Sequence, residues 1–194
     1  MKKVRYYIAL FVSRLFDPIV LFSFLFFYLL FFQIGVESED FFKTMGLVLA
    51  EVVICVGYLF YLIRKKKIDY DITDKEKRPL FLVPVVLFLV LIMPVFWYLK
   101  IDRLFLFLQV LAIIFILVWL VINRYYKISG HVGSLTIVVF LMVRIFDWPS
   151  GLFFLVLLLA WSRIELKKHS LGQTLLGFVV AWGLGEVLVR LGGY

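Results

Sequence analysis

The sequence has few of the residues that build the sites and crosslinks of a soluble enzyme. Its 194 residues include one cysteine, two histidines and only 18% charged residues. Because Cys55 is alone, an internal disulfide is excluded. The histidines, His131 and His169, form no metal-ligand cluster with it along the chain, so neither a metal nor another cofactor is expected. Internal repeats and low-complexity linkers are also lacking, and residues 1–194 are interpreted as a single domain.

Hydrophobic residues make up 64% of the chain, and its mean hydropathy is +1.06. Soluble domains average about half apolar residues, so the composition indicates an integral membrane protein. Several apolar runs approach the ~20 residues that a membrane-crossing helix needs. The sequence has none of the alternating ten-residue segments of a transmembrane barrel. It therefore predicts an all-α, polytopic transmembrane helix bundle with six to seven membrane segments.

Seven apolar runs are separated by polar loops. They cover residues 6–32, 44–63, 80–98, 104–122, 132–146, 149–161 and 171–191, the first being interrupted at Asp17-Pro18. The tight link at residues 99–103 predicts a hairpin of the third and fourth runs. At ~1.5 Å per residue, the fifth and sixth span only about 20–24 Å of a ~30 Å hydrocarbon core. We interpret those two as a short hairpin extended by its flanking turns.

With both hairpins in place, the polar loops 64–79, 123–131 and 162–170 fall on one face of the membrane. That face carries most of the lysines and arginines, including the run from Arg64 to Lys67, whereas Glu37, Glu39 and Asp40 lie on the other face. Cytoplasmic loops are enriched in Lys and Arg, so the three loops are predicted in the cytoplasm, in an inner or plasma membrane. The net charge of +8 then reflects this bias and contacts with anionic lipid or phosphate, and no nucleic-acid partner is expected.

Three polar groups on that face contain residues suited to binding phosphate. They are Arg78-Pro79, then Ser129-Gly130-His131, then Ser162-Arg163 followed by His169. Guanidinium groups grip phosphate oxygens, and helix N-termini attract anions. Two imidazoles can divide phosphoryl transfer between attack on phosphorus and protonation of the leaving oxygen. Each group alone has an ordinary explanation as a headgroup contact, a helix cap or a polar turn. Together they predict a phosphate site.

The acidic residues of the first loop give a competing interpretation. Asp71 and Asp74 have a spacing that can hold Mg²⁺ on a diphosphate, because carboxylates suit hard cations. The mixed charges around them, such as Lys75 and Lys77, are typical of a solvated loop. Asp17 and Glu51 are carboxylates within apolar runs, and no role is assigned to either of them.

The three polar groups resemble the motifs of the type 2 phosphatidic acid phosphatase superfamily, membrane branch. That family has Lys, six residues and Arg-Pro, then Pro-Ser-Gly-His, then Ser-Arg, five residues, His, three residues and Asp. The resemblance runs from about Asp71 to Gly177. It departs from the family at three positions, where Asp71 replaces the first lysine, Ile128 the proline and Gln173 the closing aspartate.

The resemblance implies a role for each matching residue and a reaction without a metal. His169 is the nucleophile that forms a phosphohistidine, and His131 protonates the leaving group. The phosphoryl group is held by Arg78, Arg163, Ser129 and the Gly130 backbone, with Lys75 or Lys77 available for the missing lysine. Asp71 and Gln173 are the two candidates for orienting His169. Glutamine at the last position also resembles a branch that includes polyprenyl-diphosphate phosphatase-like members.

The expected function is hydrolysis of a membrane lipid phosphate, either a phosphate monoester such as a phosphatidic-acid-like lipid or an isoprenoid diphosphate. Two alternatives remain open. One is a Mg²⁺-dependent polyprenyl transferase that uses Asp71 and Asp74. The other is a non-catalytic binder or transporter of lipid phosphates, which would suit the loss of the family's lysine and aspartate. The sequence assigns no oligomeric state.

Overall fold

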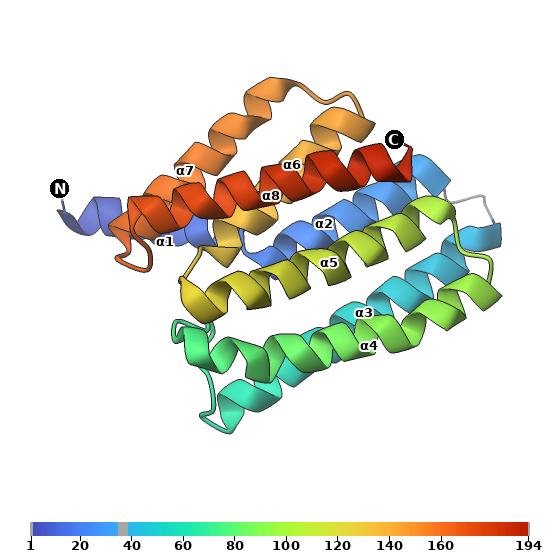
Figure 1. The fold of residues 1–194 in the computed structure, drawn as a ribbon, viewed down its shortest axis with the longest axis horizontal. Coiled ribbons are helices and arrows are strands. Elements are labelled where there is room, and N and C mark those ends of the chain that lie inside the picture. The colour runs from blue at the N-terminus through green and yellow to red at the C-terminus, as the bar shows by residue number, and fades with distance from the viewer. Residues whose placement is uncertain (1, 35–38, 194) are drawn as a thin grey trace. The chain divides into compact units, whose positions relative to one another are not determined.

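The chain is all-helical in the computed structural model, which describes residues 2–34 and 39–193 (Figure 1). No strand occurs in these residues, and the all-α prediction is confirmed. The helices are α1 (Lys2–Leu15), α2 (Pro18–Leu29), α3 (Glu39–Arg64), α4 (Arg78–Tyr98), α5 (Arg103–Tyr125), α6 (Gly130–Ile145), α7 (Phe153–Glu165) and α8 (Leu171–Gly192). A π-helical turn, η1 (Leu30–Ile34), follows α2, and two short 3-10 helices, η2 (Lys75–Lys77) and η3 (Ser150–Leu152), precede α4 and α7.

Four stretches of the described chain are long and apolar enough to cross a membrane. They are Asp40–Arg64, Lys75–Tyr98, Arg103–Tyr125 and Leu171–Gly192, and the bent pair α1–α2 makes a fifth if it is one broken span. At most 33% of the residues in their apolar windows are buried in the protein. Outward-facing apolar residues of this kind are expected where a helix meets lipid, so the fold is compatible with an integral membrane protein. Helices α6 and α7 are shorter, with 16 and 13 residues.

The first apolar run is broken where the sequence predicted, at Asp17-Pro18. The two helices on either side meet at an angle of 44°. Asp17 Oδ1 accepts the backbone N–H of Ile19 at 3.0 Å, while Pro18 occupies the first position of α2. Proline costs no hydrogen bond there and its φ suits a helix start. The break therefore results from two neighbouring residues that start a new helix.

The chain forms two compact units. Unit 1 comprises Met1–Phe22 and Tyr126–Tyr194, and unit 2 comprises Ser23–Tyr125. In unit 1, α6 packs against α8 and α7, and α1 packs against α7. Every residue of α6 from His131 to Met142 is buried, which explains why this segment has no polar stripe.

Unit 2 contains α3, α4 and α5, with α4 packed against both α3 and α5. The pairing of α4 with α5 agrees with the predicted hairpin. Apolar side chains around Val86 and Ile113 form its core. A buried polar contact lies between α5 and α3, where Gln109 Nε2 donates to Glu51 Oε1 at 2.6 Å. Both side chains are buried, so two helices long enough to span a membrane are joined by a hydrogen bond.

Candidate functional site

Unit 1 contains six of the predicted site residues. Ser129, Gly130 and His131 begin α6, while Arg163 lies near the end of α7. His169 and Gln173 flank the start of α8. The backbone N–H of Ser129 donates to the Gln173 carbonyl at 3.1 Å, which joins the start of α6 to the first turn of α8. Residues of the second and third sequence motifs are thus directly bonded.

His169 is held through its Nδ1 atom. Gln173 Oε1 lies 3.0 Å from this nitrogen and also accepts the backbone N–H of Ser170 at 3.2 Å. Because an amide oxygen only accepts, Nδ1 must carry the hydrogen, and the lone pair of the neutral ring is then on Nε2. The arrangement selects the tautomer that a nucleophilic Nε2 requires. Gln173, one of the two orienting candidates, is in contact with His169.

The turn between α7 and α8 is also fixed by the backbone of Arg163. The Arg163 carbonyl accepts the N–H groups of Lys168 at 3.0 Å and His169 at 3.3 Å. Its guanidinium is buried, and Nη1 donates to Ser13 Oγ at 2.7 Å. One residue therefore supplies both the cation of the third motif and the acceptor that places the histidine.

The start of α6 matches the predicted helix N-terminus. Ser129 has an extended backbone and its Oγ accepts the N–H of Val132 at 3.4 Å, so it is the N-cap residue. Gly130 is the first residue of the helix. The N–H groups of a first helical turn attract anions. Ser129 is completely buried, and its hydroxyl orients this turn by capping it.

His131 lies next to a carboxylate that the sequence left without a role. Its Nε2 is 3.6 Å from Asp17 Oδ2, and both side chains are buried. This distance is too long for a hydrogen bond but suits an ion pair with a protonated ring. In the sequence, the feature that could have pointed to a role for Asp17 was a carboxylate within an apolar run. The partner could not be predicted because 114 residues separate the two (131 − 17).

Arg78, Lys75 and Asp71 all belong to unit 2. Arg78 is buried at the first position of α4, where Nε donates to the Ile72 carbonyl at 3.3 Å and Nη1 donates to Asn123 Oδ1. Asn123 is the only asparagine in the chain and was missed in the sequence analysis. Its Nδ2 donates in turn to the Trp119 carbonyl at 2.8 Å.

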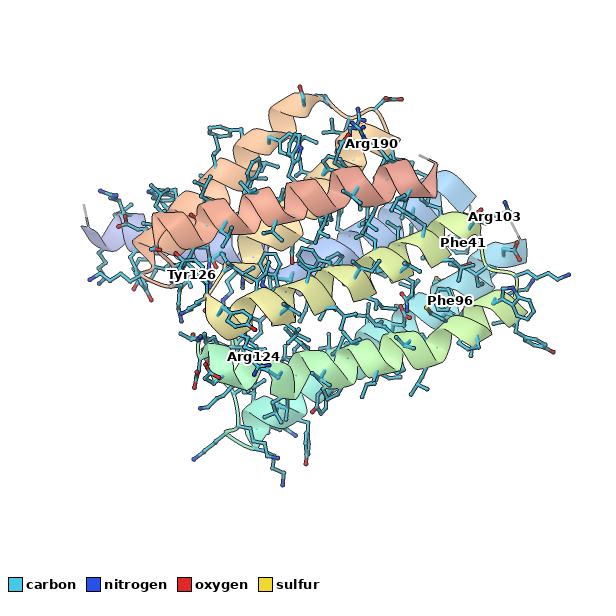
Figure 2. The ribbon with its side chains drawn as sticks, in the orientation of Figure 1. Phe41, Phe96, Arg103, Arg124, Tyr126 and Arg190 are labelled. Carbon is cyan, nitrogen blue, oxygen red and sulfur yellow. The ribbon has the colours of Figure 1, made fainter. Side chains whose placement is uncertain are left out.

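Lys75 makes a second connection between the loop before α4 and the end of α5. Its Nζ donates to the Arg124 carbonyl at 3.1 Å and is 3.5 Å from Glu76 Oε1. Arg124 is labelled in Figure 2, close to the C-terminal end of α5. The loop before α4 is therefore fastened to the end of α5 by two cationic side chains.

Two acidic residues of the loop before α4 accept local backbone hydrogen bonds. Asp69 accepts the backbone N–H of Thr73 at 2.9 Å and its hydroxyl at 2.6 Å. Asp74 caps η2 by accepting the N–H of Glu76 at 3.1 Å. Asp71 lies in the intervening turn, next to Ile72 with a φ of 43°. Over residues 2–34 and 39–193, no three His, Cys, Asp or Glu side chains are grouped so that they could hold a metal ion.

Comparisons with known protein families, with characterised proteins and with solved structures find no match for this chain.

Proposed function

We propose that the chain is a membrane lipid phosphatase related to the type 2 phosphatidic acid phosphatases. It would remove phosphate from a lipid phosphate monoester or an isoprenoid diphosphate through a phosphohistidine on His169. The observation that carries the proposal is the Nδ1 contact of His169 with Gln173, which directs the lone pair to Nε2. The sequence resemblance assigns the nucleophile to the same histidine.

The reaction would proceed in two steps. His169 Nε2 forms a bond to phosphorus while the bond to the lipid oxygen, or to the terminal bridging oxygen of a diphosphate, breaks and His131 protonates that oxygen. Water then attacks phosphorus and gives a proton to His131, and rupture of the P–N bond releases inorganic phosphate. Arg163 and the N–H groups at the start of α6 would stabilise charge on the phosphoryl oxygens. The sequence resemblance alone adds Arg78 and Lys75 as further cationic ligands. No step needs a metal.

The membrane arrangement is part of the proposal. With the bent α1–α2 pair as one span and α6 and α7 as a short hairpin, the chain crosses seven times. The loops before α4, α6 and α8 then share the cytoplasmic face, as the distribution of lysine and arginine favours. A lipid substrate would keep its tail between helices and present its headgroup to these loops.

The first experiment measures phosphate release by purified protein from a panel of lipid phosphates and diphosphates in EDTA. His169→Ala is expected to abolish release. The matched control is Lys167→Asn, which removes a nearby charge while asparagine tolerates the φ of 55° at this position. An acid-labile phosphate on the native chain, lost in His169→Ala, would identify the intermediate. Full release by His169→Ala would overturn the proposal.

The same assay separates the two rival functions. A polyprenyl transferase using Asp71 and Asp74 would be inactive in EDTA and recover with Mg²⁺. The Asp74 side chain caps η2, which weighs against it. A binder or transporter would retain lipid phosphate without releasing phosphate from any member of the panel.

A further inference from the structure

Four residues of the N-terminal segment, spaced four apart from Arg5 to Asp17, contact the elements that carry the second and third motifs. Arg5 Nη2 is 2.7 Å from Glu165 Oε2, and the Ala9 carbonyl accepts from Ser162 Oγ at 2.6 Å. Further along, Ser13 Oγ accepts from Arg163, and the Asp17 carboxylate faces His131. Residues four apart share one face of a helix. Arg5, Ala9 and Ser13 therefore present one face of α1 to α7, and Asp17, two residues beyond the end of α1, faces the second motif.

Asp17 has each carboxylate oxygen in a different role. Oδ1 is held at 3.0 Å by the N–H of Ile19 at the start of α2, and Oδ2 faces His131 Nε2 at 3.6 Å. Only 4% of Asp17 and 8% of His131 is exposed to solvent. The start of α2 thus fixes the direction in which the carboxylate points, and there is little solvent to screen its charge from the imidazole.

The other charged groups on the elements that pack against α6 have different contacts. On α7, Arg163 contacts Ser13 and Glu165 contacts Arg5. On α8, Glu186 pairs with Arg190 at 2.6 Å and lies 3.9 Å from Arg144, near the opposite end of α6. Asp17 is therefore the carboxylate that the structure sets against the His131 ring. A buried carboxylate at this distance favours the charged form of an imidazole.

We infer that Asp17 is a positioning residue that keeps His131 as an imidazolium, so that His131 can donate the proton to the leaving oxygen. This inference rests on the proposed phosphatase function. In the first step the proton passes from His131 to the oxygen as the P–O bond breaks, which leaves a neutral imidazole beside Asp17. In the second step the attacking water returns a proton to His131. The Asp17 carboxylate thus stabilises the charged form of His131, which acts as the acid. The nucleophile, His169, is instead held by the neutral amide of Gln173.

The test compares Asp17→Asn with the native chain on two substrates. Asparagine caps a helix as well as aspartate does, so the start of α2 is preserved and only the charge is removed. A lipid phosphate has a poor, alkoxide leaving group that needs the proton, whereas p-nitrophenyl phosphate does not. We expect kcat to fall about 10–100-fold on the lipid phosphate and by less than about twofold on the aryl phosphate. An equal fall on both substrates would show a merely structural role and overturn the inference.

Two further variants make the comparison specific. Asp102→Asn is the matched control, because Asp102 accepts the N–H of Leu104 at 2.8 Å at the start of α5 in the same manner. It should change neither rate. His131→Gln should reproduce the substrate dependence of Asp17→Asn, and the double variant should be no slower than His131→Gln alone. Additive losses would mean that Asp17 acts independently of His131.

The ion pair can be measured without activity, from the ¹⁵N chemical shifts of the imidazoles at about pH 7. The chain has only two histidines, so His131→Gln and His169→Gln assign both signals. Asp17→Asn should move His131 toward the neutral form and leave His169 unchanged. Unchanged His131 shifts would overturn the inference whatever the activity. If the native chain releases no phosphate at all, the proposed function fails, and these shifts alone then decide the ion pair.

Discussion

Gln173 Oε1 lies 3.0 Å from Nδ1 of His169 and 3.2 Å from the backbone nitrogen of Ser170. One amide oxygen therefore orients the histidine and closes the capping box of α8, in which Ser170 Oγ accepts the Gln173 N–H at 3.4 Å. The catalytic geometry of the proposed enzyme and the start of a helix depend on the same side chain. This coupling explains how a neutral residue can hold His169 in a defined tautomer.

The first prediction is that Gln173→Ala lowers the rate of His169 phosphorylation about 10–100-fold, the range for losing a group that orients a functional histidine. Ser170→Ala is the control, since it weakens the same cap by about 1 kcal/mol without removing the imidazole's partner. Single-turnover phosphate release and thermal unfolding of both variants separate the two effects. Equal activities in the two variants would mean that Gln173 acts only as a cap.

Gln173→Glu gives the second prediction. Glutamate also closes a capping box, so α8 should keep its start. The added charge should stabilise positive charge on His169 as the P–N bond forms. We therefore expect faster phosphorylation and slower dephosphorylation, with more phosphohistidine at steady state, measured by acid quench. Unchanged accumulation would show that charge at this position does not reach the imidazole.

The local features of this fold could be predicted from the sequence because they depend on neighbouring residues. Asp17-Pro18 breaks the first run, Ser129-Gly130 starts α6, and the short link at residues 99–103 turns α4 back onto α5. Each follows from the backbone preferences of a few residues. The motif residues could also be identified from the sequence, but the contacts that hold their side chains could not.

The contacts around the candidate site join residues far apart in the sequence. Arg163 and Ser13 are 150 positions apart, and Arg78 and Asn123 are 45 apart. In helices this apolar, periodicity gives no reliable register, since residues facing lipid and residues facing protein are equally hydrophobic. The pairing of Asp17 with His131 therefore needed the structure.

The third prediction concerns Ser13, whose Oγ accepts from Arg163 at 2.7 Å. Ser13→Ala removes this acceptor from a buried guanidinium, so a contact that directs the side chain is lost. Substrate binding should weaken, with KM for a lipid phosphate rising more than kcat falls. The control is Ser162→Ala, which breaks the bond to the Ala9 carbonyl and leaves the guanidinium contact in place. A KM change of equal size in Ser162→Ala would assign the effect to the packing of α1 on α7.

The fourth prediction tests the packing of α6 against α8. A Cβ atom added at Gly185 would lie 2.7 Å from Phe140 Cδ1, whereas one at Gly183 would meet nothing within 4 Å. Gly185→Ala should therefore destabilise the fold by about 1–3 kcal/mol through overpacking. Gly183→Ala should be neutral or slightly stabilising, since alanine favours a helix. Unfolding in detergent measures both, and equal stabilities would refute the close approach of α8 to Phe140.

The last prediction decides whether α6 and α7 cross the membrane. Cys55 is the single cysteine, so Cys55→Ala gives a background in which one introduced cysteine reports its side. Lys67→Cys, Tyr125→Cys and Lys167→Cys test the three polar loops, and Ser150→Cys tests the exposed turn at η3. A membrane-impermeant maleimide added outside intact cells should label only Ser150→Cys of these four. Asp102→Cys in the link between α4 and α5 is the external control, because that hairpin crosses in either topology. If Ser150→Cys stays protected while Asp102→Cys reacts, α6 and α7 remain on the cytoplasmic side and the chain crosses five times.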